Sequence, residues 1–207
     1  SFDHYLGRLP ASGKADVDGI PADYVNVAIG GNKITPGHAT TTCISPDVPH
    51  DWQSEHNASN QGTMDSFYAV TSTSGDPHRA LSYYEAADRP FYYALYGSYA
   101  MSDRHFASLL GPTAPNRSYL YAASSYGMKS AADGANPKTA PSIFKRLSGA
   151  GVSWSVFGGT FEWMANLDAS GPEVLTQDAF FKQAAAGALP AVSFLDPPSM
   201  STEHPPE

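Results

Sequence analysis

The sequence predicts an α/β layer fold with a partly parallel sheet. Its second half alternates the two patterns: a helix over 141–147, a strand over 152–157, a helix over 178–186 and a strand over 190–195. The joints between these segments are short, and a strand that follows a helix in this way usually returns parallel to the preceding strand. Large aromatic residues supply enough apolar surface for a packed core.

The predicted elements of the first half are shorter. Residues 24–29 alternate larger apolar residues with smaller or polar ones and end at two glycines, which predicts a strand. Residues 47–56 begin with a capping-type aspartate and have a proline early, so a short helix is expected there. Residues 64–72 form a second short helical segment.

Residues 82–101 are rich in tyrosine, alanine and leucine and are broken by Pro90. Phe91, Leu95 and Tyr99 follow one another at intervals of four, which places them on one face of a helix. We expect this face to pack in the core. The alternative, that the helix mediates association with another protein, rests on composition alone.

The helices of the second half have clear apolar faces and clear ends. Ile143, Phe144 and Leu147 share a face in the first of them, and glycines at 149 and 151 end it. In the second, Phe181 and Ala185 are in register, and a glycine at 187 ends the helix. The strand over 190–195 is predicted to be buried.

Size and charge limit the classes of function. The 207 residues suit one domain over 1–207, and a formal net charge of −8 argues against nucleic acid as a partner. Cys43 is the single cysteine, so an intrachain disulfide is excluded. The sequence has no apolar run of transmembrane length and no signal-peptide pattern, and it begins at Ser1, so we expect an internal or processed piece of a longer protein.

The turn over 111–117, Gly-Pro-Thr-Ala-Pro-Asn-Arg, is the strongest candidate for chemistry. Thr113 lies between residues that fix the backbone, and a hydroxyl in a rigid loop can be a nucleophile once a base or a metal activates it. Asn116 and Arg117 follow and can hold phosphoryl oxygens. Taken alone, the same residues also fit an ordinary structural turn.

Two of the seven histidines are candidates for function. His50 lies between a proline and an Asp-Trp pair that can fix its ring toward a pocket. His204 lies beyond the strand over 190–195, where ligands sit in open α/β sheets. For His204 a simple loop histidine is an equally good interpretation. His38, His56 and His78 are interpreted as surface or half-buried side chains.

Several short segments follow one another in a particular order along the chain. They are Ser1-Phe2-Asp3-His4-Tyr5-x-Gly7, His50-x-Trp52, Gly62-x-Met64-Asp65-x-Phe67, Asp103-Arg104-x-Phe106, Gly111-Pro112-Thr113-x-Pro115-Asn116-Arg117, Trp154, Leu189-Pro190-x-Val192-Ser193-Phe194 and Glu203-His204-Pro205-Pro206. Together they resemble a bacterial phosphoesterase family that contains phospholipases C and acid phosphatases, and the resemblance runs over nearly the whole chain.

The resemblance implies an α/β/α sandwich of the alkaline-phosphatase-like type and hydrolysis through a covalent phospho-enzyme. Thr113 corresponds to the residue that is both the nucleophile and a ligand of a divalent metal ion, whose identity the resemblance leaves open. His50 and His204 correspond to phosphate contacts. Asn116 and Arg117 match family positions, and we predict that they bind substrate. The mechanism is coherent because a metal lowers the pKa of a bound hydroxyl.

The sequence also departs from the family pattern. A Glu-Asn pair that supplies metal ligands precedes the first segment in the family, and an Asp-Glu-x-Gly-Gly segment follows the last one. Neither occurs here, so we expect a sandwich that is incomplete and a chain truncated at both ends, without a complete set of metal ligands. Ser66 stands where the family pattern leads us to expect glycine.

The sequence therefore predicts a hydrolase of phosphate esters, either phospholipase C-like or acid phosphatase-like. The alternative is a catalytically inactive fragment that binds phosphate or a lipid head group. Phosphate esters or phospholipids are the expected partners, and the oligomeric state is left open. The resemblance implies an extracytoplasmic location, secreted or periplasmic.

Overall fold

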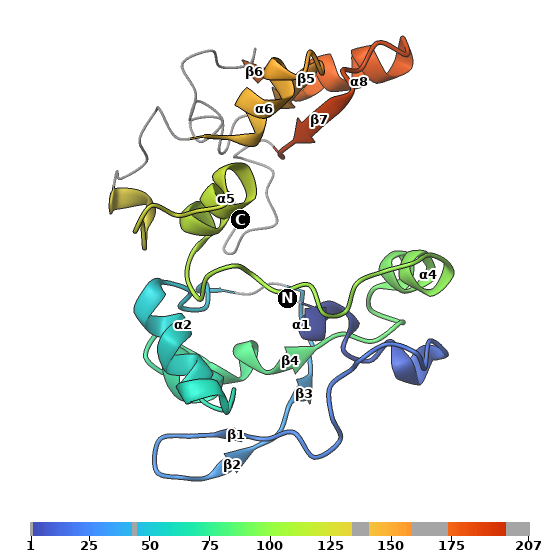
Figure 1. Ribbon diagram of the computed structural model, residues 1–207. Coiled ribbons are helices and arrows are strands. Elements are labelled where there is room, and N and C mark those ends of the chain that lie inside the picture. The colour runs from blue at the N-terminus through green and yellow to red at the C-terminus, as the bar shows by residue number, and fades with distance from the viewer. Residues whose placement is uncertain (1, 43–44, 134–140, 159–173, 198–207) are drawn as a thin grey trace. The chain divides into compact units, whose positions relative to one another are not determined.

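The computed structural model describes residues 2–42, 45–133, 141–158 and 174–197 (Figure 1). The described chain gathers into two compact units, residues 1–110 and residues 111–205. Helices and short parallel sheets occur together, which confirms the predicted α/β class. The prediction of one domain over 1–207 stays a prediction.

The first unit consists of short helices and pairs of very short strands. β1 and β2 form an antiparallel pair, and β3 and β4 form a parallel pair. The elements in chain order are α1 (Phe2–Leu6), η1 (Pro10–Ser12), β1 (Asn26–Val27), β2 (Lys33–Ile34), β3 (Gly37–His38), α2 (Trp52–Ser59), η2 (Asn60–Gly62), α3 (Phe67–Thr71), η3 (Pro77–Ala80), β4 (Ser82–Tyr83) and α4 (Pro90–Ser98).

A fully buried amide helps to hold β1 in place. Asn26 is 0% exposed, its Oδ1 accepts from the Tyr68 N–H at 2.8 Å, and its Nδ2 donates to the Tyr24 hydroxyl at 2.8 Å. A buried amide that kept no partners would cost about 1–3 kcal/mol. These bonds therefore tie β1 to the start of α3, and they explain why an asparagine is tolerated in the predicted strand over 24–29.

The helix predicted over 47–56 begins later, at Trp52. The Asp51 side chain caps it, accepting from the N–H groups of Gln53 and Ser54. Pro49 disfavours helical backbone at the residue before it, so the helix cannot extend back to Asp47. The segment predicted over 64–72 is helical only at Phe67–Thr71.

The prediction for residues 82–101 was wrong about the direction in which α4 faces. Phe91 is 70% exposed and Tyr99 is 66% exposed, and Leu95 is also exposed. Tyr93 is buried instead, at 6%, and packs with α1 and the residues that follow it. The helix is apolar on several sides, so spacing by four cannot show which side is inward. The side of α4 that carries Tyr93 is favoured as the buried side because the Tyr93 hydroxyl can donate to the Tyr84 carbonyl oxygen.

The second unit contains a three-stranded parallel sheet in the order β6-β5-β7. Its elements are α5 (Thr113–Ala122), η4 (Ala131–Asp133), α6 (Ile143–Gly149), β5 (Trp154–Phe157), β6 (Val174–Leu175), α8 (Gln177–Ala185) and β7 (Val192–Leu195). The helices and strands predicted around 141–157 and 178–195 are all present, and the parallel pairing of β5 with β7 confirms the partly parallel sheet.

An aromatic cluster around Phe144 forms the core of this unit. Phe144 is 0% exposed and stacks on Trp154 with 4.4 Å between ring centroids. Its ring also lies 5.1 Å from Tyr121 on α5 and 5.3 Å from Phe194 on β7. Aromatic pairs at these separations add to the free energy of area burial. One side chain thus joins α6 to α5 and to the sheet.

Two finer predictions for this unit were wrong. The strand over 190–195 is only half-buried, and Leu195 is 41% exposed, because β7 lies at an edge of the described sheet. On α8 the predicted inward residue Phe181 is exposed, while its neighbour Phe180 packs against Phe157 on β5 with 5.3 Å between ring centroids. Among the helices in the described ranges, we find none with the length and apolar character needed to cross a bilayer.

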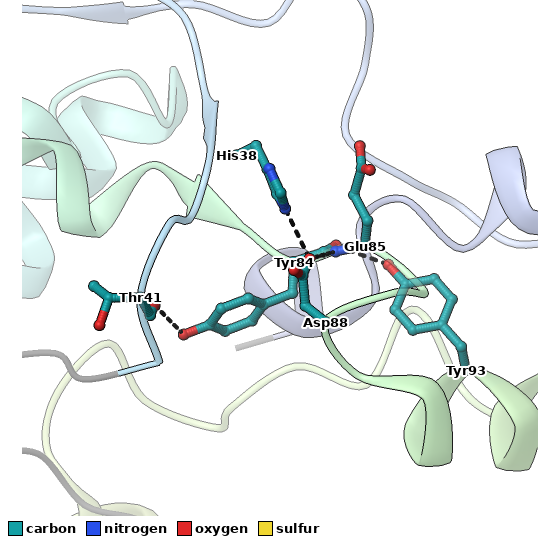
Figure 2. A network of polar contacts seen from close by, with 6 residues as sticks. All are labelled: His38, Thr41, Tyr84, Glu85, Asp88 and Tyr93. Atoms are coloured by element: carbon teal, nitrogen blue, oxygen red, sulfur yellow. Dashed lines mark hydrogen bonds and ion pairs between the residues drawn. The ribbon is translucent and has the colours of Figure 1, made fainter.

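His38 belongs to a polar network in the first unit (Figure 2). Its Nε2 lies 2.7 Å from Oδ2 of Asp88, and the same carboxylate accepts from the Glu85 N–H at 2.7 Å. The hydrogen bond to Asp88 raises the pKa of His38, which the nearby Glu85 also favours. The predicted surface histidine is thus exposed but paired.

We expect Asp88→Asn to lower the pKa of His38 toward about 6.5. Because the folded pKa is raised, the pair stabilises the fold below the unfolded pKa, and this contribution is lost as pH rises through the folded pKa. An NMR titration of the His38 ring protons measures the shift. The exposed Asp23→Asn removes the same charge elsewhere and should leave the titration unchanged; an unaltered His38 pKa in Asp88→Asn would contradict the assignment.

Candidate active site

Thr113 is the first residue of α5, and its side chain is exposed. Pro112 precedes it with extended backbone, φ −71° and ψ 178°, and acts as the N-cap residue. Ala114 and Pro115 are buried and anchor the first turn. Proline is tolerated there because the first amide groups of a helix have no acceptor within it. The hydroxyl therefore lies on the solvent side of a well-packed helix start.

The backbone around Thr113 offers donors to an anion. Prolines occupy positions 112 and 115, so the N–H groups of Thr113 and Ala114 are the donors that the helix start can provide. The helix dipole adds a partial positive charge at the same end. This arrangement suits a phosphoryl oxygen next to the Thr113 hydroxyl.

Asn116 closes the turn that carries Thr113. Its Nδ2 donates to the carbonyl oxygen of Gly111 at 3.0 Å and to that of Pro112 at 3.1 Å. Both carbonyls belong to residues before the helix, so the amide fixes the entry of the chain into α5. The structure shows this role for Asn116, and its predicted contact with substrate stays a prediction.

Arg117 makes a two-pronged ion pair with Asp196. Nη2 lies 2.7 Å from Oδ1, and Nη1 donates to Oδ2 at 3.0 Å and to the Tyr121 hydroxyl at 3.1 Å. The side chains are 24% and 9% exposed. Burial alone would lower the pKa of Arg117, but the hydrogen bond and the charge of Asp196 raise it above its usual value. The predicted substrate contact of Arg117 stays untested.

Asp196 directly follows β7, at the carboxyl end of the parallel sheet. Gly158 follows β5 at the same edge with φ of +109°, and a Cβ there would lie 2.2 Å from the Asp196 carbonyl oxygen. Only glycine fits this close approach. Sequence reasoning missed Asp196. The available signal was its position just after a strand, where α/β proteins bind ligands.

His50 lies in the first unit, two residues before α2. Its Nδ1 is 2.9 Å from the Val48 carbonyl oxygen and 3.2 Å from Oδ2 of Asp47. A carbonyl oxygen only accepts, so Nδ1 carries the hydrogen and Nε2 is the nitrogen on the other side of the ring. Asp47, which we expected near the start of a helix, orients this imidazole instead.

The predicted site residues fall into three places. Thr113, Asn116 and Arg117 share α5, within two helical turns. His50 belongs to the other compact unit. His204 lies outside the described residues. The structure therefore brings the threonine, the amide and the guanidinium together on one helix.

Within residues 2–42, 45–133, 141–158 and 174–197, no group of three or more His, Cys, Asp and Glu side chains could hold a metal ion. The carboxylate of Asp196 contacts α5 through its ion pair with Arg117. The described residues by themselves do not fit a metal site.

Comparisons with known proteins identify the family of the chain. The phosphoesterase family matches residues 1–207. The chain is 29% identical over 218 residues to phospholipase C B of Mycobacterium tuberculosis, covering 89% of this chain and 40% of that protein. It is 27% identical over 243 residues to a non-hemolytic phospholipase C of Pseudomonas aeruginosa, covering 99% of this chain and 34% of that protein.

A third relative is similar over a shorter stretch. The hemolytic phospholipase C of Pseudomonas aeruginosa is 33% identical over 131 residues, which is 58% of this chain and 17% of that protein. The chain thus spans less than half the length of these relatives.

The fold and the α5 turn define an α/β protein that presents a hydroxyl at the positive end of a helix. The chain belongs to the phosphoesterase family, as the segments around Thr113 and His50 predicted.

We expect Arg117→Met to lower the free energy of unfolding by about 2–3 kcal/mol, because it leaves a nearly buried carboxylate without its partner. Arg117→Lys should cost less, since it keeps the charge but loses the planar fork. Urea denaturation measures both. The exposed Arg146→Met on α6 is the matched control and should stay within about 0.5 kcal/mol of wild type. Equal stabilities of Arg117→Met and wild type would show that the pair does not anchor α5.

Proposed function

We propose that the protein hydrolyses phosphate esters with Thr113 as the nucleophile. The observation that carries this proposal is the exposed hydroxyl at the first position of α5, beside two backbone donors and within a family of phosphoesterases. In the first step the threonine oxygen bonds to phosphorus, and the P–O bond to the alcohol breaks as the alcohol takes up a proton. Water then attacks the phosphorus of this intermediate, the Thr113 oxygen regains a proton, and the phosphorylated head group of a phospholipid, or phosphate in the case of a monoester, is released.

The start of α5 can stabilise the developing negative charge even though it carries only a partial positive charge. The N–H groups of Thr113 and Ala114, together with the dipole of a ten-residue helix, stabilise negative charge on a phosphoryl oxygen. Asn116 and the Arg117–Asp196 pair hold the helix start in position. Pre-organised donors of this kind need little rearrangement as charge develops.

The histidines are assigned to proton transfer and to phosphate contact. His50 has its Nδ1–H held by Val48 and Asp47, which orients Nε2 to accept or donate at the substrate. His204 is proposed for the same task on the basis of the family resemblance. Asn116 and Arg117 are proposed as additional contacts to the substrate.

A divalent metal ion is part of the proposal. Thr113 is the proposed ligand among the described residues, and a bound metal would lower the pKa of its hydroxyl. Because no described cluster fits the ion, no reaction step is assigned to it.

The proposed substrates are phospholipids in preference to soluble monoesters. The support for this choice is that the relatives compared above are named phospholipases C. An extracytoplasmic location is proposed from the family resemblance.

We expect Thr113→Ala to reduce hydrolysis by at least about a thousandfold, the scale seen when a nucleophile is removed. The assay uses p-nitrophenyl phosphate and phosphatidylcholine vesicles with the longest expressed form that contains these 207 residues. Thr113→Ser keeps a hydroxyl and should retain part of the activity. Thr42→Ala, at another exposed threonine, is the control. Full activity in Thr113→Ala would eliminate the proposed nucleophile.

Removal of divalent metal is expected to abolish turnover. Dialysis against a chelator should stop hydrolysis, and one of Mg²⁺, Ca²⁺, Mn²⁺ or Zn²⁺ should restore it. Calorimetry with the restoring metal should show weaker binding to Thr113→Ala than to wild type. Activity that persists in the chelator would argue for a reaction without metal.

A further inference from the structure

The segment over 47–50 carries the candidate histidine but belongs to no helix or strand. The helix α2 begins only at Trp52, and Pro49 has no N–H group to donate. A side chain on an irregular segment is less precisely placed than one on a helix or strand, unless other groups fix the segment. The direction of His50 therefore depends on bonds from elsewhere in the first unit.

Arg79 supplies such a bond. It lies in η3, and its Nη2 donates to the Asp47 carbonyl oxygen at 3.2 Å. The same nitrogen donates to the carbonyl oxygen of Ser74 at 3.1 Å and to the hydroxyl of that serine at 2.7 Å. The hydroxyl in turn donates to the carbonyl oxygen of Thr71, the last residue of α3, at 3.1 Å. One guanidinium thus joins the segment over 47–50 to the loop between α3 and η3.

Gly75 leaves the room that this guanidinium occupies. Its φ is +130°, and a Cβ there would lie 2.6 Å from Nη1 of Arg79 and 3.4 Å from Cδ of Pro46. Glycine adopts such a backbone without strain, whereas any other side chain would push the guanidinium away. Because Pro46 directly precedes Asp47, the loop around Gly75 lies against the start of the histidine segment.

The stability of the fold does not explain why an arginine occupies position 79. Its Nε and Nη1 are shielded from solvent and have no hydrogen-bond partner among the described residues. The ion pairs between described side chains also do not include it. A shielded N–H group without an acceptor lowers stability, and an apolar side chain would avoid that loss. The arginine is better explained by the segment that it holds.

The contacts that begin at Arg79 end at the imidazole of His50. Oδ2 of Asp47 lies 3.2 Å from Nδ1 of this ring, and the Val48 carbonyl oxygen lies 2.9 Å from the same nitrogen. Both oxygens accept, so in the neutral ring the hydrogen lies on Nδ1 and Nε2 is the basic nitrogen. Arg79 holds the backbone of the residue whose carboxylate makes one of these contacts.

We propose that Arg79 is a positioning residue for His50. By holding the Asp47 carbonyl oxygen, it keeps Asp47 and Val48 where they place the hydrogen on Nδ1. This inference rests on the proposed function, which assigns His50 to proton transfer and phosphate contact. An imidazole held as one tautomer can accept a proton at one defined atom, as general acid–base catalysis requires.

The test follows the ring nitrogens of His50 by NMR in the full chain, at a pH of about 8.5, where free histidine is neutral. In wild type we expect the ¹⁵N shifts of a ring with its hydrogen on Nδ1. Arg79→Met removes the bond to Asp47, so the two ¹⁵N shifts should move toward each other as both tautomers become populated. Gly75→Ala displaces the guanidinium without removing it and should give the same change. Arg79→Lys keeps the charge but loses the planar fork, and it should restore the wild-type shifts only in part.

Two controls separate this role from a general structural one. Arg104→Met removes an exposed arginine of the same unit and should leave the His50 shifts unchanged. His56 is an internal reference, because its Nδ1 lies 2.7 Å from the Trp52 carbonyl oxygen within α2. Its shifts should stay constant in every variant. A change at His56 as large as that at His50 would show a general loosening and would overturn the inference.

A wild-type His50 with its hydrogen on Nε2, or His50 shifts that are unaltered in both Arg79→Met and Gly75→Ala, would also overturn it. If neither variant folds, the wild-type protein still decides. The guanidinium hydrogens of Arg79 should exchange with solvent more slowly than those of Arg104, and equal exchange would count against the anchor. Full hydrolytic activity of His50→Ala would refute the proposed role of the histidine, while the tautomer measurement would stand by itself.

Discussion

The ion pair between Arg117 and Asp196 is the interaction on which the candidate active site depends. It joins α5 to the carboxyl end of β7 across 79 positions of sequence, and its carboxylate is only 9% exposed. A buried pair of this kind contributes little net free energy, but removing one partner is costly. The pair therefore fixes where α5 lies against the sheet. Because Thr113 lies on α5 one helical turn before Arg117, the same pair also fixes the position of Thr113.

The surroundings of the pair show how closely the second unit is packed around it. Gly158 must be glycine because the Asp196 carbonyl oxygen occupies the space of a Cβ. Tyr121 contacts Arg117 through its hydroxyl and Phe144 through its ring, so one residue connects the polar pair to the aromatic core. The helix that carries the proposed nucleophile is thus held at its start by Asn116 and in its middle by Arg117.

The sequence predicted the helices and strands of the second unit well because their apolar spacing and glycine ends are unambiguous. It predicted α4 wrongly, since a helix with apolar residues on several sides carries no information about which side is inward. Local motifs singled out Thr113 and His50 as candidates, and their roles stay predictions. The position of Asp196 and the role of Asp47 beside His50 were missed because each depends on contacts between distant segments or on side-chain direction, which spacing does not reveal. His204 falls outside the described residues, and its role stays a prediction.

The proposed hydrolysis of phosphate esters requires an acidic chain to attract a negatively charged phosphoryl group. The net charge is −8, and Arg117, on the same helix as Thr113, is paired with a carboxylate. Attraction for the phosphoryl group must therefore come from local donors, such as the amides at the start of α5, and from any metal that binds there.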